Sequence, residues 1–233
     1  MKTVIIMNPS GTYKSIHLDE LFEKPERLLI VGASGSGKSE FATKLIRKYS
    51  HKFTHIIVSG TFKSDLEKHP ETSSKLQICR EGLYNPFTHF EIADNISLQK
   101  RHVLLLYDDA MDEFLNSKIG ADIFFKGRHW NLSVLVTLQN YYQKGSQSQT
   151  IRGQCSHLTL FKIRNLQQIL TLGRNLEGTK TRVDKFIEIY EEYVKKKPFG
   201  YITIFLDDAD ETRYRTHLVG EKGKYDTVIK FGS

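Results

Sequence analysis

The sequence predicts an α/β fold in which a mainly parallel sheet is flanked by helices. Two observations lead to this prediction. A short apolar run at residues 28–31 is followed by a glycine-rich loop and then by apolar residues at helical spacing. A second apolar run, residues 103–107, ends in two aspartates, and other strand-length runs alternate with helical patterns along the chain. Such alternation is typical of βαβ units, whose strands run parallel.

The glycine-rich loop is the clearest motif. Residues 32–39 read GASGSGKS and match G-x-x-x-x-G-K-[ST] at every fixed position. Glycines let the backbone turn its N–H groups toward a phosphate, and the following helix adds the positive end of its dipole. We expect Lys38 to reach the β and γ oxygens and the Ser39 hydroxyl to hold Mg²⁺. The alternative is an ordinary glycine-rich turn between a strand and a helix. The predicted nucleotide-binding residues are Gly32, Ala33, Ser34, Gly35, Ser36, Gly37, Lys38, Ser39 and Glu40.

Two acids follow the apolar run at residues 103–107. Parallel strands end at the edge of the sheet where ligands bind, so these acids are expected to face the glycine loop. Asp108 is the predicted metal carboxylate, and Asp109 is the predicted general base that polarises the attacking water. The alternative is that both aspartates cap a helix expected at residues 110–125.

A polar amide closes the next apolar strand, residues 132–138. Gln139 is therefore expected to contact the γ-phosphate or its water, as a sensor. The alternative is a hydrogen bond within the following loop.

The remaining elements are weaker. Strands are expected at residues 3–7, 53–59, 76–79, 156–163 and 201–206, and helices at 166–173 and at 182–196, where Pro198 blocks continuation. Residues 8–25 and the segment after 206 read as turns and polar stretches. We expect one domain, with a lead-in at residues 1–26, a core at 27–206 and a C-terminal tail at 207–233.

Composition limits the class of protein. The 233 residues are 39% hydrophobic and 26% charged, and no apolar run is long enough to cross a bilayer. The N-terminal segment lacks a signal-peptide cleavage pattern and the two cysteines have no metal-binding spacing, so an intracellular protein is expected. The net charge of +7 favours a polyanionic partner, although many plain cytosolic domains are as basic.

The order of the motifs predicts an extra strand between the loop-bearing strand and the acid-bearing strand. That is the layout of a RecA-like P-loop NTPase core of the additional-strand type, which carries an added catalytic acid. Four blocks, GASGSGKS, LLLYDD, GRHWNLSVLVTLQNYY and IRGQCSHLTLFK, resemble the FtsK–HerA superfamily of DNA-translocating ATPases. Within it, the chain looks most like the compact genome-packaging ATPases of poxviruses, other large DNA viruses and virophages.

The resemblance implies an ATPase that uses Mg²⁺ and packages double-stranded DNA into a capsid. It also implies a pentameric or hexameric ring, capsid or portal-vertex partners, no membrane, and a location in the host cytoplasm, viral factory or virion. ATP is further favoured because no guanine-specific N-K-x-D box occurs. The alternatives are another motor of the superfamily, of the conjugation or helicase type, and a nucleotide-binding switch or scaffold with little turnover.

Members of this superfamily complete each site with an arginine from the neighbouring subunit, which implies that role for Arg128 or Arg152. We favour Arg128; the alternative for both arginines is a surface contact with phosphate or simple solvation. Contacts with the DNA backbone are expected from the loop after Gln139 and a nearby lysine, and the alternative is a solvated loop. The predicted DNA-binding residues are Lys126, Tyr141, Tyr142 and Lys144.

Overall fold

The computed structural model describes residues 2–7, 13–18, 21–60, 62, 65–80, 82–89, 101–109, 111–208, 213–216, 218–219 and 227–229. The turn expected at residues 8–11 lies outside this set. The strands are β1 (Lys2–Met7), β2 (Tyr13–Leu18), β3 (Arg27–Val31), β4 (His55–Gly60), β5 (Leu76–Cys79), β6 (Val103–Asp108), β7 (Leu132–Leu138), β8 (His157–Leu160), β9 (Ile202–Phe205), β10 (Tyr214–Thr216) and β11 (Thr227–Ile229).

The helices lie mainly between the strands of the parallel region. They are α1 (Lys38–Tyr49), α2 (Pro70–Ser73), α3 (Pro86–His89), α5 (Met111–Asn116), α6 (Lys118–Lys126), α7 (Ser148–Gly153), α8 (Leu166–Glu177) and α9 (Lys180–Tyr190). Short 3₁₀ turns are η1 (Ser50–Lys52), η2 (Leu66–Lys68) and η3 (Gly127–Trp130), and a π-helical turn, η4 (Glu191–Lys195), extends α9. No helix among the described residues has the length and apolar character needed to cross a bilayer.

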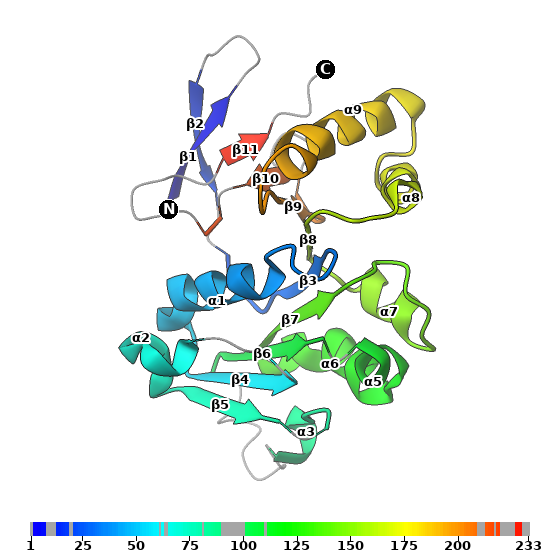
Figure 1. The fold of residues 1–233 in the computed structure, drawn as a ribbon. Coiled ribbons are helices and arrows are strands. Elements are labelled where there is room, and N and C mark those ends of the chain that lie inside the picture. Colours follow the sequence, from blue (N-terminus) through cyan, green and yellow to red (C-terminus); the bar gives the residue numbers. More distant parts are fainter. Residues whose placement is uncertain are drawn as a thin grey trace.

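The strands of the described residues form one sheet in the order β2-β1-β11-β10-β9-β8-β3-β7-β6-β4-β5 (Figure 1). From β8 to β5 all neighbours are parallel. From β8 outward through β9 and β10 to β11 the pairs are antiparallel, and β1 then joins β11 in parallel. The predicted mainly parallel sheet is thus confirmed, and β7 lies between β3 and β6 as expected.

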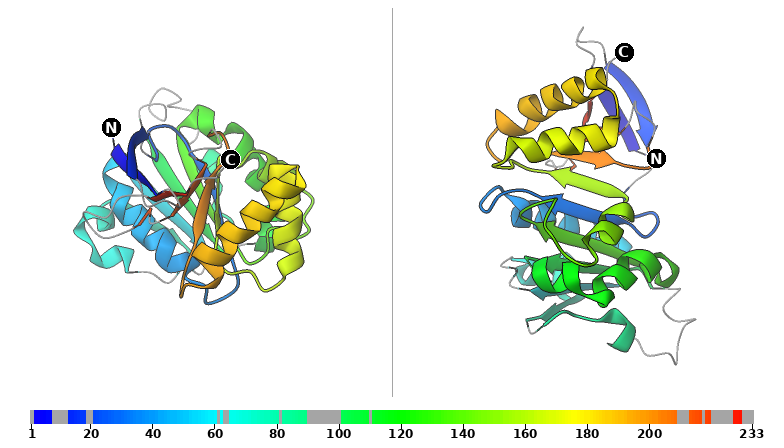
Figure 2. Two further views of the ribbon diagram at one scale, coloured as in Figure 1. Left: turned by 90° about the horizontal axis from the view of Figure 1, so that it is seen from above. Right: turned by 90° about the vertical axis from the view of Figure 1, so that its right-hand side faces the viewer.

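Helices cover both faces of the sheet, with α1 and α2 on one face and α5 to α9 on the other (Figure 2). Side chains of β3 alternate between the two cores. Leu28 and Ile30 pack with Leu45 of α1, whereas Leu29 and Val31 belong to the core under the other helices. Because both faces are buried, the strand reads as a continuous apolar run.

The prediction of a single helix at residues 110–125 is wrong. Two helices, α5 and α6, meet at Ser117, whose hydroxyl accepts a hydrogen bond from the N–H of Ile119 (3.0 Å) and so starts a new helix. Gly120 permits the close contact, because a Cβ there would lie 2.3 Å from the carbonyl oxygen of Phe114.

The helix expected to end near Gly173 continues to Glu177. Gly173 is an internal contact residue, because a Cβ there would lie 2.8 Å from Cδ1 of Phe186 on α9. The glycine therefore allows α8 and α9 to pack closely and does not stop the helix.

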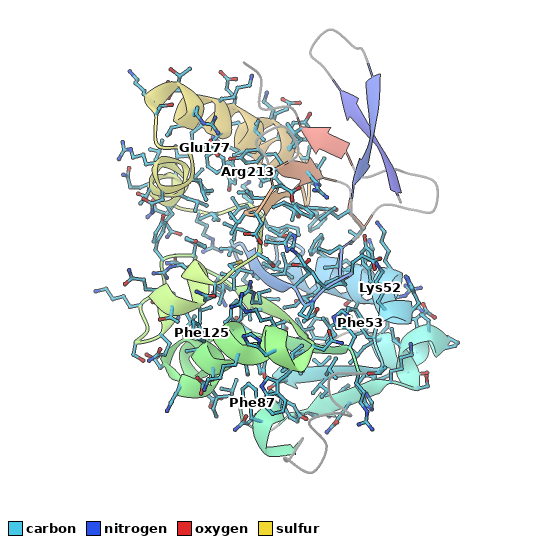
Figure 3. The ribbon with its side chains drawn as sticks, turned by 180° about the vertical axis from the view of Figure 1, so that it is seen from behind. Lys52, Phe53, Phe87, Phe125, Glu177 and Arg213 are labelled. Atoms are coloured by element: carbon cyan, nitrogen blue, oxygen red, sulfur yellow. The ribbon has the colours of Figure 1, made fainter. Side chains whose placement is uncertain are left out.

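Three strands were not predicted. β2 lies in the N-terminal polar stretch, and β10 and β11 lie in the C-terminal tail. The buried Glu177 ties α8 to this region, since its carboxylate contacts Arg182 of α9, Arg213 at 3.5 Å and the Tyr214 hydroxyl (Figure 3). These contacts anchor α8 and α9 on the antiparallel part of the sheet.

Candidate active site

The glycine loop joins the carboxyl end of β3 to the first turn of α1. The N–H of Gly32 donates to the carbonyl of Leu138 (3.0 Å) at the end of β7, and the N–H of Ala33 donates to the carbonyl of Lys162 (2.9 Å) beyond β8. The loop is thus held by both strands that flank β3. Because α1 begins at Lys38, the N–H groups of its first turn are directed at the same space.

Several positions of the loop require glycine, and Gly37 and Gly32 show two different reasons. Gly37 has φ +100°, in the left-handed region, immediately before α1. A Cβ on Gly32 would lie 2.5 Å from Cβ of Phe161 and 2.7 Å from the Ser36 hydroxyl. That hydroxyl is buried and has no hydrogen-bond partner among the described residues. A buried hydroxyl without a partner is expected where a bound ligand supplies the hydrogen bond.

Lys38 lies along the loop and is only 9% exposed. Its ammonium donates to the carbonyls of Gly32 (2.7 Å) and Ala33 (3.1 Å). Burial lowers the pKa of Lys38, while the charges of Asp109 and Asp108 act to raise it. The lysine is therefore held over the loop by acceptors that phosphate oxygens can replace.

Asp108 ends β6 and points into the same cavity. Its Oδ1 accepts a hydrogen bond from the hydroxyl of Thr137 (2.6 Å), and Thr137 also accepts the N–H of Asp109 (3.1 Å). One threonine of β7 therefore positions both aspartates. Burial raises the pKa of Asp108 and the Asp109 charge adds to this, while the Thr137 hydrogen bond and Lys38 act in the opposite direction.

Asp109 and Gln139 are in direct contact. The Gln139 amide donates to Oδ1 of Asp109 (3.1 Å). Asp109 has φ +51°, a left-handed conformation that is uncommon outside glycine, asparagine and aspartate. The chain thus turns sharply after β6, and this turn brings the Asp109 carboxylate to the end of β7.

These groups line one cavity of about 330 Å³. The glycine loop and the start of α1 form one wall, and the ends of β6 and β7 form the other. Its lining residues are Ser34, Gly35, Gly37, Lys38, Ser39, Glu40, Asp108, Asp109, Thr137, Gln139 and Phe199. The structure thus brings together Lys38, Ser39, both aspartates and Gln139, so one ligand can contact all of them.

The donor set fits Mg²⁺. A hydroxyl, Ser39, and a buried carboxylate, Asp108, line the same cavity. Within the part of the chain that the structure describes, no three His, Cys, Asp or Glu side chains form a metal-binding group. Mg²⁺ is commonly held by only one or two protein oxygens together with substrate phosphates and water. Ser39 and Asp108 are the residues that would hold it.

The structure does not bring Arg128 or Lys126 to this cavity. Both precede β7, at the amino edge of the sheet, and both are exposed; Lys126 pairs with Asp122 on its own helix (3.1 Å). The expected proximity of Lys126 to the loop after Gln139 is therefore wrong, because the whole length of β7 lies between them.

The tyrosines after Gln139 form a packed cluster. The rings of Tyr141 and Tyr142 meet edge to face at 5.1 Å, and the Tyr142 hydroxyl accepts from Asn175 of α8 (2.9 Å). Arg152 lies over both rings and donates to the carbonyl of Tyr141 (3.1 Å). Both tyrosines are half-buried against the core, and Lys144 is exposed.

Three residues in or beside this site were not predicted from the sequence. Thr137 could have been found as a polar residue inside a strand buried on both faces, since such a hydroxyl needs a partner. Gly60 is the last residue of β4, and a Cβ there would lie 2.4 Å from the carbonyl oxygen of Asp108 on the neighbouring β6. Phe199 lies in a Pro-Phe-Gly sequence directly before β9, a turn pattern that was recognised only as a helix stop.

A profile of the family described as "Poxvirus A32 protein" matches residues 13–213. The "DNA packaging protein OPG160" of Monkeypox virus is 26% identical over 147 residues, which are 59% of this chain and 48% of that protein. "Uncharacterized protein 075L" of Invertebrate iridescent virus 6 is 26% identical over 197 residues, 78% of this chain and 70% of that one. This chain thus spans about half the length of the curated poxvirus relatives that it matches.

A solved structure shares the fold. The genome packaging NTPase B204 of Sulfolobus turreted icosahedral virus 2, in complex with AMPPCP, matches with a TM-score of 0.53 and 14% identity. The match covers 78% of this chain and 93% of that chain. At this identity the likeness shows the fold alone.

Proposed function

The chain belongs to the poxvirus A32 protein family, and on that premise we propose that it is an ATP-hydrolysing DNA translocase that packages double-stranded viral DNA into a capsid. The observation that carries the proposal is the cavity that Lys38 lines together with Asp108, the last residue of β6, and Asp109, which follows it. The names of the poxvirus relatives and of the B204 structure support packaging, and the ATP analogue bound to B204 supports a nucleotide ligand.

In this proposal the loop and Lys38 bind the β- and γ-phosphates, and Lys38 exchanges its loop carbonyls for phosphate oxygens. Ser39 and Asp108 would hold Mg²⁺, which would supply positive charge to neutralise the phosphate oxygens. Asp109 accepts a proton from the attacking water, and the Gln139 amide orients that water. The hydrogen bond between Gln139 and Asp109 supports a shared position for the two groups.

The remaining parts of the proposal concern assembly. The protein works as a pentameric or hexameric ring in which Arg128 of one subunit reaches its neighbour's site. The exposure of Arg128 supports this choice. Arg152, by contrast, already donates a hydrogen bond to the carbonyl of Tyr141 in its own chain. Lys144, exposed on the loop after β7, contacts the DNA backbone, while Tyr141 and Tyr142 shape that loop. Capsid or portal proteins are the assembly partners.

The test is ATP turnover with and without duplex DNA across a salt series, together with the size of the assembly in ATP. Duplex DNA is expected to stimulate hydrolysis, and the stimulation is expected to fade as salt rises, because backbone contacts release counterions. Asp109→Asn is the inactive control. A rate indifferent to DNA at every salt concentration would refute translocation, and nucleotide binding without turnover would identify a switch.

A further inference from the structure

A second cavity of about 460 Å³ adjoins the phosphate cavity. It is lined by the outer side of the glycine loop at residues 33–36, by the turn at residues 198–200, and by five cationic side chains. Ser34, Gly35 and Phe199 line both cavities, so the two are adjacent. Its cationic residues are Lys162, Arg164, Lys195, Lys196 and Lys197.

The position of this cavity matches the path of a nucleotide. The aspartates and Gln139 lie on the β7 and β6 side of β3, so a terminal phosphate points that way. The second cavity lies on the opposite side, beyond the ends of β8 and before β9. A nucleotide whose β-phosphate lies in the loop therefore directs its sugar and base into this cavity.

Phe199 is the aromatic residue of the cavity, and it is 71% exposed. A Cβ placed on Gly37 would lie 3.3 Å from its Cδ1, so the ring borders the glycine loop directly. An exposed ring beside a phosphate site offers a stacking face to a nucleobase.

The backbone holds Phe199 in an unfavourable conformation. The N–H of Gly200 donates to the carbonyl of Lys197 (3.2 Å), with Pro198 second and Phe199 third in the turn. Phe199 has φ +53°, where such turns normally carry glycine or asparagine. Glycine occurs only at the next position, where a Cβ would lie 2.3 Å from the carbonyl oxygen of Tyr193. A bulky residue kept in a strained position beside a ligand cavity indicates a role for its side chain.

We propose that this second cavity is the nucleobase and ribose subsite, and that it holds a purine by stacking against Phe199. The inference rests on the proposed function. Lys195 and Lys196 pair with Glu191 and Glu192 one turn earlier, and the other three cations, Lys162, Arg164 and Lys197, favour an anionic ligand. The lining contains no carboxylate or amide side chain to distinguish the edges of adenine and guanine. The ligand class is therefore purine nucleoside triphosphates, with little preference between ATP and GTP.

The experiment measures binding of ATP, GTP and inorganic tripolyphosphate, which has no base, to the wild-type protein and to Phe199→Gly. Glycine relieves the left-handed strain, so the variant is expected to fold at least as stably. ATP and GTP affinities should fall about tenfold or more, while tripolyphosphate affinity stays within about twofold. Phe199→Tyr should retain purine binding. Phe125→Ala, which removes an exposed ring from α6 near the amino edge of the sheet (Figure 3), is the matched control and should change nothing.

Unchanged ATP affinity in Phe199→Gly would overturn the inference, as would an equal loss of tripolyphosphate binding, because the ring would then act on the loop. A wild-type preference of about a hundredfold between ATP and GTP would also overturn it, since stacking alone discriminates weakly. A wild-type protein that binds neither ATP nor tripolyphosphate would overturn the proposed function and this inference together.

Discussion

The hydroxyl of Thr137 donates a 2.6 Å hydrogen bond to Oδ1 of Asp108, and both groups are buried at the ends of adjacent strands. Thr137 also accepts the backbone N–H of Asp109. The orientation of the acid pair therefore depends on one side chain from β7.

Thr137→Val, which keeps the shape and removes the hydroxyl, should raise the Mg²⁺ concentration needed for turnover about 10- to 100-fold, because outer-shell partners orient metal ligands. Turnover measured across a Mg²⁺ series checks this. Thr159→Val is the matched control, since it removes a buried hydroxyl that bonds Thr203 (2.9 Å) away from the cavity. It should lower stability and leave the Mg²⁺ requirement unchanged; the same Mg²⁺ shift in both variants would contradict the role of Thr137.

Asp109→Asn should bind nucleotide normally and lose about 10²- to 10⁴-fold in turnover, because the amide cannot accept the proton. Asparagine tolerates the left-handed backbone of this position, so the fold should persist. Binding and single-turnover rates measure the two effects separately. Asp122→Asn on α6 removes a surface acid and should be fully active. Wild-type turnover in Asp109→Asn would exclude this residue as the base.

Arg128→Ala should leave ATP binding intact and abolish turnover. If the arginine acts between subunits, mixing Arg128→Ala with Lys38→Ala should restore measurable turnover, because some interfaces then combine an intact loop with an intact arginine. Arg152→Ala should instead lower stability, since its guanidinium packs on Tyr141 and Tyr142. Wild-type turnover in Arg128→Ala alone would rule out its role.

Glu26→Gln should stabilise the protein in a pH-dependent way. Burial raises the pKa of Glu26 to about 6 from an ordinary value of 4.5, although a hydrogen bond from Ser156 acts to lower it. The ionised carboxylate therefore weakens the fold by about 2 kcal/mol above pH 6, and this penalty disappears as pH falls through 6 to below 4.5. The variant should gain about 2 kcal/mol at pH 8 and almost nothing at pH 4.5, as measured by urea unfolding.

The neighbouring histidine does not obscure this comparison. Nδ1 of His157 lies 3.4 Å from Oε2 of Glu26, but burial lowers the pKa of His157 to about 3, so the two are not an ion pair near neutral pH. Protonation of His157 in the unfolded chain is the same in both proteins and cancels from the difference. An equal gain at pH 8 and pH 4.5 would show that the ionisation of Glu26 is not responsible.

Gly173→Ala distinguishes helix propensity from packing. Propensity alone predicts a gain of about 1 kcal/mol for alanine in a helix. The new methyl group would lie 2.8 Å from Phe186, so we expect a loss of about 1–3 kcal/mol instead. Gly153→Ala in α7 meets nothing within 4 Å and should be neutral or slightly stabilising. Thermal or urea unfolding of both variants shows whether propensity or packing dominates at Gly173. A Gly173→Ala protein more stable than the wild type would refute the packing argument.

The local pattern of residues was enough to predict the central strands, the glycine loop, the start of α1 and the meeting of Lys38 with Asp108, Asp109 and Gln139. Side-chain period identifies buried strands, and parallel strands end at one edge of the sheet, so residues that follow them must lie near each other. The placement of β7 between β3 and β6 also followed, from the order of the motifs along the chain.

Contacts between distant segments were not visible in that pattern. The bond of Thr137 to Asp108, the packing of Gly173 on Phe186, the pairing of β10 and β11, and the strained turn that holds Phe199 over Gly37 each depend on a partner in another element. The spacing of apolar residues along a helix or strand shows which of its faces is buried. It carries no information about which side chains of another element pack against that face. For the same reason Lys126 and Lys144, close in sequence, were wrongly expected together, because an intervening strand carries the chain from one edge of the sheet to the other.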